Sequence, residues 1–341
     1  SKMKRSTISE VAKLAGVSRA TVSKVFNNDE KISKKTRDKV LEIAKKLNYQ
    51  PSAIARSLRN KKSKAIGLML PNITNPFFPQ VVRGVEEVAL ENNYVVIFCS
   101  FEEQFQKESQ YFQLLDNRWI DGIIFSGVTG DKEEKEYIQN IQKRGIPIVF
   151  IDRGIEGHFS NLVAIDNEEA TFKGTRYLIE LGHKRIGFVN GPGEVKLFAK
   201  RLEGYKRALQ ESGLEFDKDL VVEGKQNPGV AEQAVKQFLS QKKPPTAIFA
   251  TSDLVAIALL REVQNRGLGV PEDISIMGFD NVPLASLTSP SLTTVAQPIY
   301  KMGVEATKLL IDHIEKKETT KRKIILDTEL VIRESTAKVE N

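Results

Sequence analysis

Charged and hydroxyl-bearing side chains directly follow several short apolar segments of this chain. Carboxylates accept hydrogen bonds and a guanidinium donates them in a planar fork, so these residues together would bind a ligand rich in hydroxyl groups. Arg201, on the expected helix after the segment GFVNGPG, adds a guanidinium. We expect Asp253 to cap the helix that follows it. The other residues are Asp152 and Arg153 after IVFI, Ser252 after IFAT, and Asp280 and Asn281 after IMGF.

Asp152 and Asp280 are also the residue types that a glycosidase uses as acid and base, so a sugar-binding or sugar-modifying enzyme with a basic N-terminal extension is the alternative. The sequence contains no nucleophile elbow (G-x-S-x-G) and no phosphate loop (G-x-x-x-x-G-K-[ST]). Gly191-Pro192-Gly193 is too short for a dinucleotide-binding fingerprint. We therefore expect a protein that is not an enzyme and uses no cofactor.

The elements that must position the polar residues are strands, because β-branched runs alternate with helical stretches from Lys64 onward. Two groups of strands fit an α/β body of two doubly wound parallel-sheet lobes. Ligands of such folds bind outside the carboxyl ends of the strands, here in the crevice between lobes. The expected strands are 65–70, 94–99, 122–125, 146–151, 161–165, 185–189, 220–222, 246–250 and 274–278, followed by a helix over 299–316 and a strand-like segment over 324–332.

Composition excludes several classes of protein. A chain of 341 residues with 40% hydrophobic and 28% charged residues is globular and long enough for two or three domains. No apolar stretch approaches 18 residues and the first residues lack an apolar signal core, so we expect a cytoplasmic protein without a membrane partner. One cysteine, Cys99, and three scattered histidines predict neither an intrachain disulfide nor a metal site.

The net charge of +7 is divided unevenly along the chain. Residues 1–64, the basic head, hold 18 Lys and Arg against five Asp and Glu, whereas the remainder holds 33 against 39. A basic head on a mildly acidic body suggests an anion-binding module, and nucleic acid is the commonest polyanion. A solvated basic tail is the alternative.

Helical periodicity in the first fifty residues argues against a solvated tail. Residues 7–10 (TISE) form a capping box, followed by apolar Val11 and Leu14, and this helix should stop near Gly16. Ser18 then caps a second helix that runs to Phe26, which gives a helix-turn-helix. A third helix is expected from residue 33 to about 47. Its apolar stripe, which closes an all-α three-helix core, is Val40, Ile43, Ala44 and Leu47.

The second helix of a helix-turn-helix enters the major groove of DNA. Val22 and Val25 should point inward, whereas Arg19 can pair with guanine and Ala20 can offer an apolar contact, for example to a thymine methyl. Neighbouring hydroxyl and amide side chains either hold phosphates or cap helices. The predicted DNA contacts of the helices are Thr7, Ser18, Arg19, Ala20, Thr21, Ser23, Lys24 and Asn27.

The segments TISEVAKLAGVSRATVSKVFN, KISKKTRDKVLEIAKKLNYQPSAIARSL, FDN and LTTVAQP resemble the LacI/GalR (lactose-repressor) family of bacterial transcription regulators over essentially the whole chain. The resemblance implies a repressor of carbohydrate-utilisation genes that binds operator DNA. The family's hinge, matching residues 51–59, becomes helical on the operator, and its leucine, here Leu58, wedges into the minor groove and kinks the duplex. Tyr49 and Ala55 match further hinge-region contacts.

The resemblance also implies a body like the periplasmic binding proteins, with an effector between its lobes. Matching effector contacts are Asp152, Arg201, Ser252, Asp280 and Gln297, with Phe77 and Phe78 over the ligand's apolar face. Gln226 is a further predicted effector contact. Near it the sequence departs from the galactoside-sensing pattern, since no aromatic residue stands there, and Leu197 replaces a small polar residue. Arg153 and Lys196 would suit a phosphorylated or carboxylated sugar.

The expected domains are a helix-turn-helix domain (1–49), a hinge (50–63), an N-terminal lobe (64–164 with 297–325) and a C-terminal lobe (165–296 with 326–341). No leucine heptad follows the last strand, so we expect a homodimer on a pseudo-palindromic operator rather than the family's tetramer. Lys301 and Lys308 stand where catabolite-control members contact a phosphorylated carrier protein through acidic and arginine side chains, so that partner is not expected. Effector binding should change the tilt of the N-terminal lobes, the distance between the hinges and thereby operator affinity.

Overall fold

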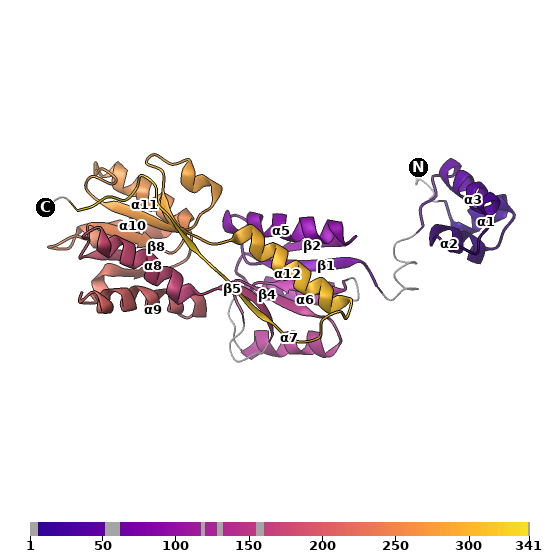
Figure 1. Cartoon of the computed structure of the whole chain (residues 1–341), viewed down its shortest axis with the longest axis horizontal. Coiled ribbons are helices and arrows are strands. Elements are labelled where there is room, and N and C mark those ends of the chain that lie inside the picture. Colours follow the sequence, from indigo (N-terminus) through magenta and orange to yellow (C-terminus); the bar gives the residue numbers. More distant parts are fainter. Residues whose placement is uncertain (1–5, 52–61, 117–119, 128–131, 155–159, 340–341) are drawn as a thin grey trace. The chain divides into compact units, whose positions relative to one another are not determined.

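The structure is a computed structural model that describes residues 6–51, 62–116, 120–127, 132–154 and 160–339. The chain divides into two compact units, Ser1–Lys64 and Ala65–Asn341. The first unit is helical, and the second combines sheets with covering helices (Figure 1). No helix in the described ranges is long and apolar enough to cross a membrane.

Capping side chains set the three helices of the basic head, α1 (Ile8–Ala15), α2 (Arg19–Phe26) and α3 (Lys34–Lys46). The Thr7 hydroxyl accepts from the backbone N–H of Glu10, whose carboxylate accepts from the N–H of Thr7 at 2.7 Å. Gly16 ends α1 at φ +65°, a left-handed conformation that favours glycine. Ser18 and Ser33 cap α2 and α3. The predicted helix-turn-helix is confirmed.

The head closes around a small aliphatic core. Val11, Val22, Val25, Val40 and Ala44 are buried, while the other two residues of the predicted α3 stripe are only partly buried. Not every apolar residue after the capping box turns inward. Leu14 is 60% exposed, and α1 instead buries Ala12 and Ala15 beside Val11.

The body contains two six-stranded sheets among the described residues, in the orders β11-β5-β4-β3-β1-β2 and β12-β10-β9-β8-β6-β7. All neighbouring strands pair in parallel except β10 and β12. The predicted class of two parallel-sheet α/β lobes is confirmed. The strands are β1 (Ala65–Leu70), β2 (Val95–Ser100), β3 (Gly122–Phe125), β4 (Ile148–Ile151), β5 (Asn161–Ile165), β6 (Ile186–Asn190), β7 (Val221–Glu223), β8 (Ala247–Ala250), β9 (Ser275–Asp280), β10 (Thr293–Ala296), β11 (Lys323–Leu326) and β12 (Glu329–Val331).

Helices cover both faces of each sheet. In the N-terminal lobe, whose sheet ends at β11 and β2, α5 and α12 pack on one face and α6 and α7 on the other (Figure 1). In the C-terminal lobe, α8 and α9 cover one face, and α10 and α11 cover the other. These helices are α5 (Phe77–Glu91), α6 (Phe105–Asp116), α7 (Lys132–Lys143), α8 (Asn167–Glu180), α9 (Lys196–Glu211), α10 (Gly229–Leu239), α11 (Asp253–Asn265) and α12 (Ile299–Ile314), with 3₁₀ turns η1 (Lys218–Leu220) and η2 (Pro283–Ser286).

The structure differs from the sequence-based expectation near the end of the chain. The strand-like segment predicted over 324–332 is two strands, β11 and β12, which belong to different sheets. The polar residues Asp327 and Thr328 interrupt it and carry the chain from one lobe to the other. The four-residue strand β10, inside the segment LTTVAQP, was not predicted as a strand.

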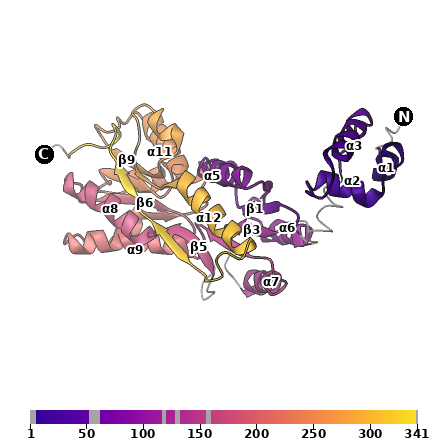
Figure 2. The same ribbon diagram turned by 45° about the vertical axis from the view of Figure 1, so that its right-hand side comes forward.

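Helices α5 and α12 lie side by side in both views (Figures 1 and 2) and approach closely through paired glycines. A side-chain methyl group at Gly84 would overlap the backbone carbonyl oxygen of Tyr300, and one at Gly303 would overlap the carbonyl oxygen of Val81. Because the obstacles are backbone atoms, they cannot rotate away. The glycines therefore set the separation between the first and last helices of the N-terminal lobe.

We predict that Gly84→Ala destabilises the protein by about 1–3 kcal/mol, because the added methyl group forces the two helices apart. Glu86→Ala, at an exposed position of the same helix, should stay within about 0.5 kcal/mol of wild type. Urea unfolding followed by circular dichroism measures both. Equal midpoints for the two variants would show that the helices separate without cost.

Candidate functional site

The exposed face of α2 is the first candidate site. Arg19, Ala20, Lys24 and Asn27 are exposed, while Val22 and Val25 are buried in the head core. This is the division that a helix needs if one face reads a groove and the other packs.

The remaining predicted contacts of the head have partners within it. Ser18 accepts from the N–H of Thr21, and their hydroxyls lie 3.0 Å apart, so both take part in the cap; Ser18 is exposed and Thr21 is half-buried. Ser23 is half-buried, and exposed Thr7 belongs to the α1 capping box. Tyr49 is half-buried and packs edge-on against Phe26, with ring centroids 5.7 Å apart. Ala55 and Leu58 lie outside the described residues.

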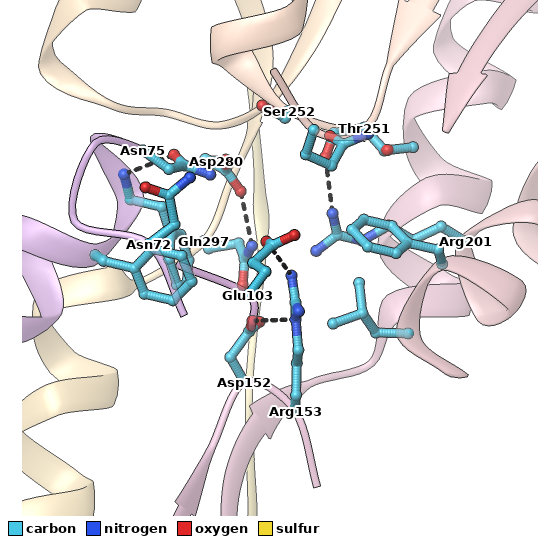
Figure 3. A pocket seen from close by; sticks show the side chains of 15 residues that line it. Asn72, Asn75, Glu103, Asp152, Arg153, Arg201, Thr251, Ser252, Asp280 and Gln297 are labelled. Atoms are coloured by element: carbon cyan, nitrogen blue, oxygen red, sulfur yellow. Dashed lines mark hydrogen bonds and ion pairs between the residues drawn. The ribbon is translucent and has the colours of Figure 1, made fainter. Parts of the chain in front are cut away.

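The second candidate site is a pocket of about 420 Å³, part of it open to solvent, which we call the interlobe pocket. Side chains at or after the carboxyl ends of strands in both sheets line it, which is where ligands bind to parallel α/β sheets. Figure 3 shows them converging from the two lobes. The lining residues are Asn72, Asn75, Phe77, Phe78, Glu103, Asp152, Arg153, Leu197, Phe198, Arg201, Gln226, Thr251, Ser252, Asp280 and Gln297.

Arg201 is the most constrained cation of the interlobe pocket. Its Nη1 donates to the carbonyl oxygen of Thr251 at 2.8 Å and its Nε to Oδ1 of Asn167 at 2.9 Å. The guanidinium also stacks over the ring of Phe279, 4.0 Å from the centroid. Burial lowers the pKa of Arg201, and Asp280 and Asp152 oppose that effect. Two hydrogen bonds and an aromatic face fix the plane in which it can meet a ligand.

Arg153 is held between two carboxylates, as Figure 3 shows. Its Nη2 lies 3.6 Å from Oε1 of Glu103 and its Nε 3.9 Å from Oδ2 of Asp152. Asp152 has φ +62°, a left-handed conformation that is unusual for a non-glycine residue. Burial raises the pKa of Asp152, while Arg153 and Arg201 lower it. The positive charge of Arg153 is therefore largely balanced before any ligand binds.

Asp280 ends β9 with φ +119°, a strained backbone conformation. Its Oδ1 accepts from Nε2 of Gln297 at 2.8 Å, which joins the end of β9 to the segment after β10. Burial raises the pKa of Asp280 well above its usual value, and the neighbouring Asp253 raises it further. Strained backbone and a displaced pKa in one concave site are typical of functional residues.

Aromatic rings supply the apolar part of the lining. Phe77 and Phe78 begin α5 and meet edge to face, with centroids 5.0 Å apart. Phe198 lies beneath both guanidinium groups, 5.6 Å from Arg153 and 5.5 Å from Arg201. A side chain at Gly191 would overlap the Phe198 ring, so this glycine is needed for the ring's position.

We expected from the sequence that Asp253 caps the helix that follows, and this prediction is wrong. The cap is Ser252, which accepts from the N–H of Val255. Asp253 is buried and faces the other way: its Oδ2 accepts from the N–H of Val282 at 2.8 Å and its Oδ1 from the Thr294 hydroxyl at 2.7 Å. It therefore holds the turn after Asp280 against β10. Burial raises the pKa of the Asp253 carboxyl from 3.8 to about 7, against hydrogen bonds from these two groups that lower it.

Nine of the ten residues predicted to contact an effector line the interlobe pocket. Lys196 does not: it is exposed at the start of α9 and absent from the lining, which removes one of the two cations that suggested a charged sugar. Sequence reasoning missed Asn72, Asn75, Glu103, Phe198 and Thr251 as candidates. Glu103 and Thr251 follow strands, as the predicted residues do, so that signal was available; no comparable signal marks Phe198.

Comparison with known proteins identifies relatives of both parts of the chain. Residues 7–52 match the model for bacterial regulatory proteins of the lacI family, and residues 175–336 match a periplasmic binding protein-like domain. The ribose operon repressor of Halalkalibacterium halodurans is 39% identical over 98% of this chain and 98% of its own length.

Two solved structures are similar to this chain. The lac repressor dimer bound to operator and the anti-inducer ONPF is 26% identical, with a TM-score of 0.88 over 98% of this chain and 100% of the other. A LacI family regulator from Enterococcus faecium with bound ribose is 30% identical, with a TM-score of 0.73 over 81% of this chain and 100% of the other.

We predict that Asp253→Asn changes how stability depends on pH. The folded protein keeps the Asp253 proton up to about pH 7, whereas the unfolded chain loses it near pH 4, so the folded state binds more protons in this window and loses stability as pH rises through it. The asparagine does not titrate. Wild type should therefore lose up to about 1.4 kcal/mol per pH unit relative to the variant between pH 4 and 7.

Urea unfolding of both proteins at several pH values measures the difference. Parallel pH profiles would contradict the raised pKa of Asp253.

Proposed function

The chain belongs to the lacI family of bacterial regulatory proteins, and we propose that it represses carbohydrate-utilisation genes with an operator affinity set by a small sugar or sugar derivative in the interlobe pocket. As a family member it is a DNA-binding transcription regulator. The observation that carries the proposal is the convergence of hydroxyl-binding groups from both lobes on one pocket, in a chain that also carries a helix-turn-helix. The similar ribose operon repressor and ribose-bound regulator support a sugar.

We propose that α2 reads the major groove through Arg19 and Ala20, and that exposed lysines and hydroxyls around it hold phosphates. The hinge (50–63) would add Leu58 in the minor groove, where an apolar wedge favours flexible central base steps. The proposed domain limits, with lobes of 64–164 with 297–325 and of 165–296 with 326–341, place each strand in the lobe of its sheet except for the last residues of β5 and β11, Ile165 and Leu326.

The proposed control is allosteric. A ligand that contacts Asp152 from one lobe and Arg201 and Asp280 from the other has an affinity that depends on how the lobes are inclined. It can shift operator binding only by its difference in affinity for the two arrangements, about 1–3 kcal/mol in typical cases. A change in lobe inclination would alter the distance between the two hinges of a dimer and hence the fit to two half-sites.

A homodimer formed through the body accords with an apolar edge of the N-terminal lobe. β2 is the edge strand of its sheet, and Val95 on it is 66% exposed. Leu90 on α5 and Leu114 on α6 are exposed by 67% and 65%. An unprotected edge strand with neighbouring exposed apolar residues is a candidate for pairing with a second copy.

We predict that Arg201→Lys abolishes the response to effector and leaves operator binding within about twofold, because lysine keeps the charge but loses the planar fork. Fluorescence anisotropy with DNA from the gene's own promoter region, with and without pooled sugars, measures both. Arg207→Lys is the matched control, since it lies on the same helix and pairs with Glu168 and Glu169 outside the interlobe pocket. Loss of operator binding in Arg201→Lys would mean that Arg201 is structural.

We predict that Val95→Asp converts the dimer to monomers, because a buried unpaired carboxylate opposes association. Sedimentation velocity should give a dimer for wild type and for Ile332→Asp, an equally charged change at another exposed apolar position. A wild-type tetramer, or a dimer in Val95→Asp, would contradict the proposed interface.

A further inference from the structure

The turn that follows β9, residues 280–282, has a backbone conformation that residues other than glycine seldom adopt; we call it the strained turn. Asp280, which ends β9 and lines the interlobe pocket, has φ +119°, and the next residue, Asn281, has φ +59°. Two consecutive residues of this kind persist only where their surroundings hold them. The direction of the Asp280 carboxyl group therefore depends on what holds the strained turn.

Two side chains that are absent from the pocket lining hold the strained turn. Asp253 accepts from the N–H of Val282 at 2.8 Å. Arg333 donates from Nη2 to Oδ1 of Asn281 at 2.7 Å and from Nη1 to the carbonyl oxygen of Leu292 at 2.8 Å. Because Leu292 directly precedes β10, one guanidinium joins the strained turn to the strand beside β9.

The contact with Arg333 also explains where the side chain of Asn281 goes. The sequence places Asn281 directly after IMGF, together with Asp280, and we grouped both with the ligand-binding residues on that ground. In the structure Asn281 is not part of the pocket lining, and its side chain accepts from Arg333 instead. The two neighbours therefore divide the work: Asp280 meets the pocket and Asn281 meets the group that holds the turn.

The backbone from which Arg333 reaches the turn is itself fixed. The N–H of Arg333 donates to the Thr293 hydroxyl at 2.9 Å. Two residues later, the Ser335 hydroxyl accepts from the N–H of Thr293 at 2.8 Å and donates to the carbonyl oxygen of Ile276 on β9. The guanidinium therefore approaches the strained turn from a segment that is tied to both β9 and β10.

This segment follows directly on the last passage of the chain between the lobes. The chain leaves β11 in the N-terminal lobe, crosses at Asp327 and Thr328, and enters the C-terminal lobe as β12, which pairs with β10. Arg333 stands two residues after β12 ends at Val331. A ligand that contacts Asp280 is therefore connected, through one side chain, to a segment that joins the lobes.

We propose that Arg333 is a positioning residue of the effector site: its guanidinium holds the strained turn so that Asp280 faces into the interlobe pocket. This inference rests on the proposed function of that pocket. The role needs the planar fork of arginine, since a single ammonium group cannot reach Asn281 and Leu292 in the same two directions.

Isothermal titration calorimetry on the full chain tests the proposal. The probe is the member of a panel of neutral sugars, sugar acids and sugar phosphates that wild type binds most tightly. Arg333→Lys keeps the charge but loses the fork, so it should bind the probe about 10-fold more weakly, while its affinity for DNA from the gene's own promoter region stays within about twofold. Arg266→Lys is the matched control, since Arg266 is exposed at the end of α11 and pairs with Glu262.

Asn281→Gly tests the same contact from the other side. Glycine adopts a positive φ without strain, so this change removes the acceptor of Arg333 and leaves the backbone conformation accessible. It should also weaken binding of the probe. The double variant with Arg333→Lys should bind about as weakly as Arg333→Lys alone, because both changes break one interaction.

Hydrogen exchange followed by mass spectrometry measures the strained turn without a ligand. The N–H of Val282 is bonded to a buried carboxyl group, so the peptide that contains it should exchange slowly in wild type and about 10-fold faster in Arg333→Lys. A peptide from β6, which has no contact with Arg333, should exchange equally in both proteins.

Unchanged exchange at the turn, unchanged probe affinity in Arg333→Lys, or additive losses in the double variant would each overturn the positioning role. Loss of operator binding together with probe affinity in both single variants would overturn it as well, because it would show a general support of the fold. In these cases wild type still binds the probe, and only the role of Arg333 fails. If wild type binds no member of the panel, or shows no specific operator binding, the proposed function itself fails.

Discussion

Parallel pairing between neighbouring strands is the constraint on which the interlobe pocket depends. Strands that run in the same direction need a crossover helix, so their carboxyl ends meet at one edge of each sheet. Helices on both faces keep the strands apolar along their length, and β3, β4 and β8 are buried throughout. Polar chemistry is therefore confined to the residue or two after each strand. Asp152 and Thr251 occupy those positions after β4 and β8, and Asp280 is the last residue of β9.

The interlobe pocket gathers groups that oppose folding. A buried ion costs several kcal/mol before compensation, and Arg201 recovers part of this through Thr251, Asn167 and the Phe279 ring. The left-handed backbone at Asp152 and the strained one at Asp280 each add about 1–3 kcal/mol. A ligand that satisfies such groups stabilises the arrangement of lobes that holds it, which is the physical basis for coupling ligand to lobe inclination.

Local signals in the sequence predict most of the fold. Capping residues locate α1 to α3 correctly because a cap and its partner are three residues apart, and the nine predicted strands fall within two residues of those observed. The site is less accessible to such reasoning. Asp253 looks like a cap because it stands at a helix start, yet its partners Val282 and Thr294 come from distant segments. Phe198 carries no local mark, since its role depends on Gly191 and on two arginines from different lobes.

The late return of the chain to its N-terminal lobe affects how the protein can be synthesised. Strands β1 to β5 are complete at residue 165, but α12, which covers them beside α5, begins at residue 299. Roughly 130 residues must leave the ribosome in between, which takes on the order of ten seconds at typical rates. During that time the apolar face that α12 will cover is open to water and to other chains. The N-terminal lobe is the first to be translated, but the C-terminal lobe has nearly all its strands before α12 can complete the N-terminal lobe. A nascent chain stalled before residue 299 would therefore expose an apolar surface that chaperones bind.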